Sequence, residues 1–113
     1  MDIKQRDSWV CKYCGLDGKE SFANWRALTD DHLLPHGHPL RDDAAYCVTA
    51  CGSCNMKLNQ FFKSAEGQAI PKTAVPEDLV EVRRKYLTPK IRELYEEWLD
   101  QMTTHAKNHT TPA

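Results

Sequence analysis

Four of the five cysteines in this 113-residue chain form two Cys-x-x-Cys pairs, a spacing typical of metal ligands. Cys11 and Cys14 lie in the sequence CKYCG, and Cys51 and Cys54 lie in CGSCN. The turn within each pair lets both thiolates face one ion, and four thiolates make a closed tetrahedral zinc site without a position for substrate. The pairs therefore predict one structural zinc ion, which can contribute on the order of 10 kcal/mol to folding.

A redox dithiol is the alternative role for a Cys-x-x-Cys pair. Such dithiols belong in a βαβ setting, and no such pattern surrounds either pair here. The fifth cysteine, Cys47, shares side-chain parity with Cys51 if both lie on one strand, which would bring it near the zinc. We expect Cys47 to be a buried, inert thiol instead, because free cysteines are among the most buried residues.

A hairpin and a helix are the elements expected to position the second cysteine pair. Residues 28–34 are typical of a strand that Pro35 ends, and residues 46–51 alternate as the return strand. The polar stretch 36–43 predicts the loop between them. A helix is expected over residues 55–65, and its apolar contacts come from Met56, Leu58, Phe61 and Phe62.

The C-terminal part of the chain predicts helices. Residues 67–76 are typical of a linker, and a first helix is expected over residues 76–86. Thr88 and Pro89 form a helix-start signal, so a second helix is expected over residues 88–103. The second helix has an apolar stripe that predicts core packing, made of Ile91, Leu94, Tyr95, Trp98, Leu99 and Met102.

Three motifs of the chain, in this order, resemble the HNH endonucleases, the ββα-metal nucleases. The motifs are WVCKYCG, DHLLP and YCVTACGSCN, and the last one leads into the predicted helix. The resemblance covers roughly Trp9 to Phe62. It implies an α+β fold with a ββα-metal core, stapled by a four-cysteine zinc site and followed by C-terminal helices. It also implies a metal-dependent DNA endonuclease or nickase that hydrolyses phosphodiester bonds.

The resemblance also implies catalytic roles for three residues. His32 matches the general base that activates water, and Asp31 and Asn55 match the ligands of one catalytic divalent ion. An imidazole can accept a proton near neutral pH, and a carboxylate with an amide oxygen suits Mg²⁺ or Mn²⁺. Structural roles stay open for two of them, since His32 could be a structural histidine and Asn55 a helix N-cap. Asp31 and His32 also face opposite sides of a regular strand, so either the site straddles the edge of the strand or the backbone bends there.

The middle motif position of the family usually holds an Asn, but here it holds Tyr46. A tyrosine cannot copy the paired donor and acceptor of an amide. Either another residue holds the loop, with Asp42, Asp43 and His38 as candidates, or the enzyme is weakened. This departure favours an alternative function, a zinc-stapled nucleic-acid or protein binding adaptor with a degenerate site.

The domain organisation follows from these patterns. We expect residues 1–66 to form an HNH nuclease-like domain with zinc knuckles, within which residues 1–8 are a loosely held arm. Residues 21–28 fit either a strand or a short helix. Residues 67–113 are expected to form a linker, a helical C-terminal extension and a short tail.

The charge of the chain limits its partners. A formal net charge of -1 gives no general attraction to DNA, so contacts must come from local charge at Arg41, Lys57, Lys63 or the cluster of residues 83–85. We expect little sequence specificity because no feature reads base edges. No apolar run is long enough for a membrane and no secretory leader pattern opens the chain, so we expect a cytoplasmic protein. The C-terminal helices could join a protein partner or a homodimer.

Overall fold

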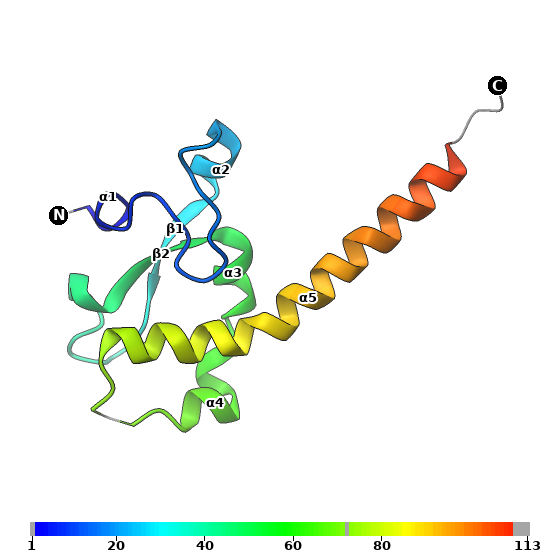
Figure 1. The fold of residues 1–113 in the computed structure, drawn as a ribbon. Coiled ribbons are helices and arrows are strands. Elements are labelled where there is room, and N and C mark those ends of the chain that lie inside the picture. The colour runs from blue at the N-terminus through cyan, green and yellow to red at the C-terminus, as the bar shows by residue number, and fades with distance from the viewer. Residues whose placement is uncertain (1, 72, 110–113) are drawn as a thin grey trace.

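The computed structural model of the chain describes residues 2–71 and 73–109. Its centre is a two-stranded antiparallel sheet of β1 (Leu28–His32) and β2 (Cys47–Cys51), followed directly by α3 (Gly52–Lys57) (Figure 1). The register pairs Leu28 with Cys51 and His32 with Cys47. This arrangement confirms the predicted α+β class and the ββα order of elements.

The N-terminal segment covers the sheet instead of forming a loose arm. Helix α1 (Ile3–Arg6) contacts both strands, and the Asp2 side chain caps it by accepting the backbone N–H of Lys4. Asp7 is buried and accepts the backbone N–H of Thr49 at 2.8 Å. The expectation of a loose arm is therefore wrong for residues 2–8, because Asp7 satisfies a backbone N–H of β2. Met1 lies outside the described residues.

A short helix settles the segment that fitted either a strand or a helix, and a second one precedes β2. Residues 21–28 contain helix α2 (Phe22–Arg26), which the Ser21 hydroxyl caps. Tyr46 lies in a 3-10 helix, η1 (Ala44–Tyr46), and β2 begins one residue later than predicted. The Asp43 side chain caps η1 by accepting the backbone N–H of Ala45, so one of the three candidate loop residues does hold the loop.

The single helix predicted to follow Cys54 is interrupted. After α3 come the 3-10 helix η2 (Phe61–Lys63) and helix α4 (Ala65–Gln68). Ser64 begins α4 by accepting the backbone N–H of Gly67, which is a helix-start signal inside the predicted helix. A Cβ at Gly67 would lie 2.0 Å from the Phe61 carbonyl oxygen, so only glycine permits this close return of the chain.

The C-terminal region forms one helix, α5 (Pro76–Asn108), of 33 residues. The predicted break at Thr88 and Pro89 is wrong, since the Thr88 hydroxyl donates to the Arg84 carbonyl within the helix and does not cap a new one. Pro89 is exposed and lies inside the helix, and a proline there costs a backbone bond and bends the helix. Figure 1 shows α5 changing direction in its yellow part. None of the described helices is long and apolar enough to cross a membrane.

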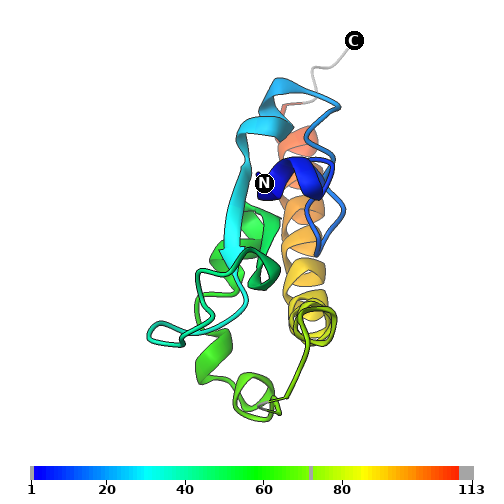
Figure 2. The same cartoon turned by 90° about the vertical axis from the view of Figure 1, so that its left-hand side faces the viewer.

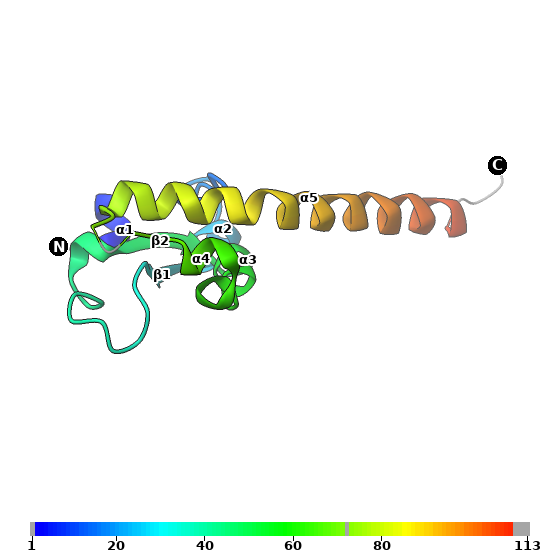
Figure 3. The same ribbon diagram turned by 90° about the horizontal axis from the view of Figure 1, so that it is seen from below.

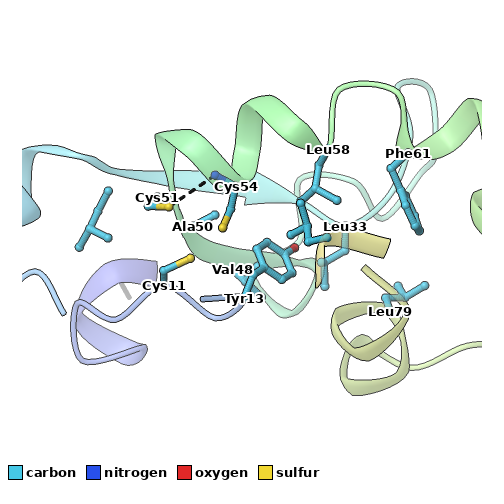
Figure 4. Packing of buried hydrophobic residues seen from close by; sticks show 12 residues of the cluster. Cys11, Tyr13, Leu33, Val48, Ala50, Cys51, Cys54, Leu58, Phe61 and Leu79 are labelled. Atoms are coloured by element: carbon cyan, nitrogen blue, oxygen red, sulfur yellow. Dashed lines mark hydrogen bonds between the residues drawn. The ribbon is translucent and has the colours of Figure 1, made fainter. Parts of the chain in front are cut away.

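The first half of α5 packs on the rest of the fold, and its buried residues recur every fourth position as Leu79, Arg83 and Leu87. Figure 2 shows α5 running beside the hairpin and α3, which α5 also contacts. The core between them is formed mainly by small and aliphatic side chains together with Phe61, which is fully buried and lies toward one end of the cluster (Figure 4).

The second half of α5 projects away from the body of the molecule (Figure 3). Its apolar stripe was expected to pack in the core, but four of its members are 42–57% exposed: Tyr95, Trp98, Leu99 and Met102. The helical period correctly identified one apolar face. The period could not indicate that the rest of the described fold leaves this face exposed.

Candidate metal centres and nuclease site

The four predicted zinc ligands converge. The sulfur atoms of Cys11, Cys14, Cys51 and Cys54 all lie within 4.8 Å of one another, and the Cys14 and Cys51 sulfurs are 3.7 Å apart. Zinc–sulfur bonds of about 2.3 Å in a tetrahedron place the sulfurs about 3.8 Å apart. Figure 4 shows the sulfurs of Cys11, Cys51 and Cys54 turned toward one another. This cluster is compatible with one zinc ion.

Local backbone geometry builds both turns of the cluster. Gly15 has a φ of +80° and donates its N–H to the Cys11 carbonyl, which closes the first turn. Cys51 caps α3, because its sulfur accepts the backbone N–H of Cys54 at 3.4 Å. Cys47 is buried outside the cluster with its sulfur 3.6 Å from the Arg41 carbonyl oxygen, as expected for a thiol that does not bind the ion.

The thiols of the cluster compete for negative charge. Hydrogen bonds from Cys14, Cys51 and Cys54 lower the pKa of Cys11 far below its ordinary value. The same contact with Cys11 raises the pKa of Cys54 and of Cys14. One thiolate is therefore favoured at the expense of the others, and a divalent cation among them is what allows four thiolates to coexist.

Asp31 on β1 is buried, and its carboxylate is bonded to residues of the first cysteine turn and of α5. The Tyr13 hydroxyl donates to Asp31 Oδ2 at 2.6 Å. Arg83 Nη2 donates to Asp31 Oδ1 at 3.2 Å and to Oδ2 at 3.0 Å. Tyr13 lies between Cys11 and Cys14, so the first cysteine turn and α5 both hold the same carboxylate.

Tyr13 stays protonated in this network. Burial raises its pKa, the charge of Asp31 and the bond to that carboxylate raise it further, and the nearby Arg83 only partly opposes them. The phenol is therefore a permanent donor to Asp31 and an acceptor for Arg83 Nε, which lies 3.0 Å away. Neither partner was predicted as a site residue, because Tyr13 and Arg83 lie on segments that are separated from Asp31 in the sequence.

His32 is the last residue of β1, and its side chain is about one third exposed. Its Nε2 atom lies 3.5 Å from Oδ1 of Asp42, a residue of the loop between the strands. Asp42 was one of three candidates to replace the missing Asn, and of these it is the one beside the imidazole. Asp31 and His32, although neighbours on β1, line the same cavity.

Asn55 lies in α3, not at its N-cap, which Cys51 occupies. Its Nδ2 donates to the Thr29 hydroxyl at 3.1 Å, and that hydroxyl donates its own proton to the Ala50 carbonyl. The Thr29 oxygen can therefore only accept from Asn55, which fixes the orientation of the amide. Among the described residues, the Asn55 amide oxygen has no hydrogen-bond partner and remains available to a cation.

One cavity of about 350 Å³ brings the three predicted site residues together. Asp31, His32 and Asn55 line it with other polar residues that sequence reasoning did not assign to the metal site: Asp30, His36, Arg41, Asn59 and Arg83. The carboxylate of Asp31 and the free amide oxygen of Asn55 are the hard oxygen donors that Mg²⁺ or Mn²⁺ prefers, so the donor set fits such an ion.

Comparison with known proteins identifies one family. Residues 11–61 match the family model described as HNH endonuclease. This segment contains both cysteine pairs and all three predicted site residues, and it ends before α5. No curated protein and no solved structure matches the chain.

Proposed function

We propose that the chain is a metal-dependent DNA endonuclease or nickase, because residues 11–61 match the family model described as HNH endonuclease. The observation that carries this proposal is the cavity at the end of β1, which Asp31, His32 and Asn55 share. A base and two oxygen donors within one cavity are what hydrolysis of a phosphodiester requires.

His32 takes the proton from the attacking water in this proposal. Its partial exposure lets water and a phosphate approach, and Asp42 lies close enough to orient the ring and to balance the charge that the imidazole gains. Asp31 and Asn55 would hold the divalent ion, and such an ion would supply Lewis-acid stabilisation of the phosphate and of the departing oxygen.

The thiolate cluster has a separate task. Cys11, Cys14, Cys51 and Cys54 would hold a structural zinc ion, because their four sulfurs converge, and a site of four thiolates leaves no position for substrate. Its structural contribution reaches the nuclease site through Tyr13, which donates to Asp31. We also propose a cytoplasmic location, since thiols that bind zinc must stay reduced.

DNA would be held by local positive charge. Arg41 lines the cavity, and Lys57 and Lys63 lie on the segment that follows β2. These residues suit phosphate contacts, which carry no sequence information, so little specificity is expected from this chain. The exposed apolar face of α5, in the extension formed by residues 67–113, is the proposed contact for a protein partner or a homodimer.

A zinc-stapled binding adaptor is the second candidate function. One observation favours it: both oxygens of Asp31 already accept hydrogen bonds within the protein. An adaptor would use the fold and the zinc site but would not cleave DNA.

Cleavage of supercoiled plasmid separates the two candidates. The wild type with Mg²⁺ or Mn²⁺ is compared with His32→Ala, and His105→Ala serves as a matched control on the exposed surface of α5. If the chain is a nuclease, the wild type and His105→Ala cleave the plasmid and His32→Ala does not. Removal of the divalent ion then abolishes cleavage. Equal cleavage by all three proteins would indicate a contaminating nuclease, and cleavage by none would favour the adaptor.

A further inference from the structure

Arg83 belongs to α5, outside the segment that matches the family, yet it lines the candidate nuclease cavity. Its side chain is 2% exposed. A buried arginine must be paired and hydrogen-bonded to offset its desolvation. The partners of Arg83 therefore indicate which buried groups the guanidinium stabilises.

Those partners all belong to the site. Nη2 donates to both oxygens of Asp31 and lies 3.3 Å from the His32 carbonyl oxygen, and Nε donates to Tyr13. The guanidinium carbon lies 4.9 Å from the centre of the Phe61 ring and 5.3 Å from that of Phe62. One side chain of α5 thus holds the carboxylate of one site residue and the backbone of the next, with its guanidinium packed against aromatic rings.

The hydrogen bonds at Asp31 limit how it can bind an ion. A carboxylate offers about four acceptor positions, two on each oxygen. Tyr13 and Arg83 use both positions on Oδ2, and Arg83 uses one on Oδ1. One position on Oδ1 is left, so Asp31 can bind a cation through that oxygen alone and in one orientation.

We propose that Arg83 is a positioning residue that orients Asp31 toward the catalytic divalent ion, so that α5 completes the nuclease site. This inference rests on the proposed function. Partners of this kind, which hydrogen-bond a metal ligand from behind, fix the ligand's orientation and commonly contribute 10- to 100-fold in metal affinity. The opposite effect is a physical alternative, because a guanidinium also repels a cation. The burial of Asp31 favours the positioning role, since without Arg83 its charge would be uncompensated.

Binding of Mn²⁺ to the zinc-loaded full chain, followed by electron paramagnetic resonance, tests this role without reference to cleavage. Arg83→Met keeps the apolar stem and removes the charge, and Arg84→Met is the matched control because the Arg84 side chain is about half exposed. We expect Arg83→Met to weaken Mn²⁺ binding by about 10- to 100-fold and Arg84→Met to leave it unchanged. Unchanged or tighter binding by Arg83→Met would overturn the proposal, as would a wild type that binds no Mn²⁺.

A double-mutant cycle shows whether Arg83 acts through Asp31. If it does, Arg83→Met adds little further loss of Mn²⁺ affinity to Asp31→Asn, whereas additive losses would contradict the proposal. If Arg83→Met does not retain zinc and fold, Tyr13→Phe takes its place, because it removes one donor to Asp31 and keeps the ring. Tyr13→Phe is expected to weaken Mn²⁺ binding, and unchanged affinity would again count against the proposal.

The two proposals can fail separately. Asp31-dependent Mn²⁺ binding that Arg83 strengthens, without plasmid cleavage, would refute the nuclease but leave the role of Arg83 intact. Cleavage and Mn²⁺ binding that are both indifferent to Arg83→Met would leave the nuclease intact and refute the role of Arg83.

Discussion

Thr29 on β1 fixes the amide of Asn55 on α3 by accepting a hydrogen bond from its Nδ2 at 3.1 Å. The hydroxyl can only accept in this contact because its single proton goes to the Ala50 carbonyl. The pair therefore joins the strand to the helix of the ββα unit and leaves the Asn55 amide oxygen for the proposed ion.

Replacing Thr29 by valine tests this orientation. Thr29→Val keeps the branched shape but removes the acceptor, so the amide of Asn55 is free to turn. We expect Mn²⁺ affinity to fall by about tenfold, at the lower end of the effect of such supporting bonds, with zinc content unchanged. Thr88→Val is the control, because the Thr88 hydroxyl donates to the Arg84 carbonyl within α5 and Thr88 is exposed. Equal affinity in Thr29→Val and wild type would show that the bond does not orient a ligand.

Zinc should be bound by four cysteines and not by the fifth. Cys11→Ser removes a buried sulfur from the cluster, and we expect loss of most of the zinc and of cooperative unfolding. Cys47→Ser should retain about one zinc per chain, because its sulfur lies apart from the cluster. The zinc content of both variants is measured after mild chelation. Loss of zinc in Cys47→Ser, or its retention in Cys11→Ser, would contradict this ligand set.

Asp7 should stabilise the fold except in acid. Burial favours a raised pKa, but hydrogen bonds from Arg6 and from the backbone of Thr49 outweigh it and hold the Asp7 pKa below its ordinary value. A lowered pKa in the folded state contributes stability that is complete above the unfolded value of about 3.9 and is lost as the pH falls through the folded value.

Asp7→Asn should therefore lower the free energy of unfolding by about 1–3 kcal/mol near neutral pH, the range for bonds to charged groups. The difference from wild type should be constant above about pH 5 and should shrink below about pH 4. Urea unfolding across this range measures it, with Asp100→Asn on the exposed part of α5 as the control. A difference that grows in acid would show that the carboxylate is not stabilised by folding.

Asp42 should assist His32 without being essential. Its carboxylate is 89% exposed and its Oδ1 lies 3.5 Å from His32 Nε2, so water can partly replace it. Asp42→Ala is expected to reduce plasmid cleavage by severalfold, less than the 10²–10⁴-fold that a general base itself contributes. A loss as large as that of His32→Ala would assign Asp42 a direct catalytic role, and no loss would show that the loop orients His32 by other contacts.

The cysteine cluster and the ββα unit could be predicted because short-range patterns specify them. Each Cys-x-x-Cys turn is local, and the strand predicted over residues 46–51 is present as β2, although it begins at Cys47 and is buried at every position instead of at alternate ones. The break predicted at Pro89 failed because a helix-start signal is also tolerated inside a long helix that bends. The helix predicted after Cys54 contains a start signal that sequence reasoning missed. Ser64 is a good N-cap residue, and it accepts the backbone N–H of Gly67 to begin α4.

The partners of the site residues could not be predicted in this way. Arg83 begins a run of three basic residues in a pattern typical of a solvated helix face, yet it is buried against Asp31, far away in sequence. That contact depends on the docking of α5, which no local pattern encodes. Similarly, the apolar stripe of α5 was identified, but whether it is covered depends on the extent of the fold.

Chemical rescue of His32→Ala tests the central claim, that the His32 imidazole is the base in metal-dependent cleavage of DNA. The measurement is the rate of supercoiled plasmid cleavage with Mg²⁺, with and without added imidazole. We predict that His32→Ala loses at least about 10²-fold in rate and that imidazole restores part of it, while Asn55→Ala is not rescued. Cleavage by His32→Ala at the wild-type rate without imidazole would contradict the account.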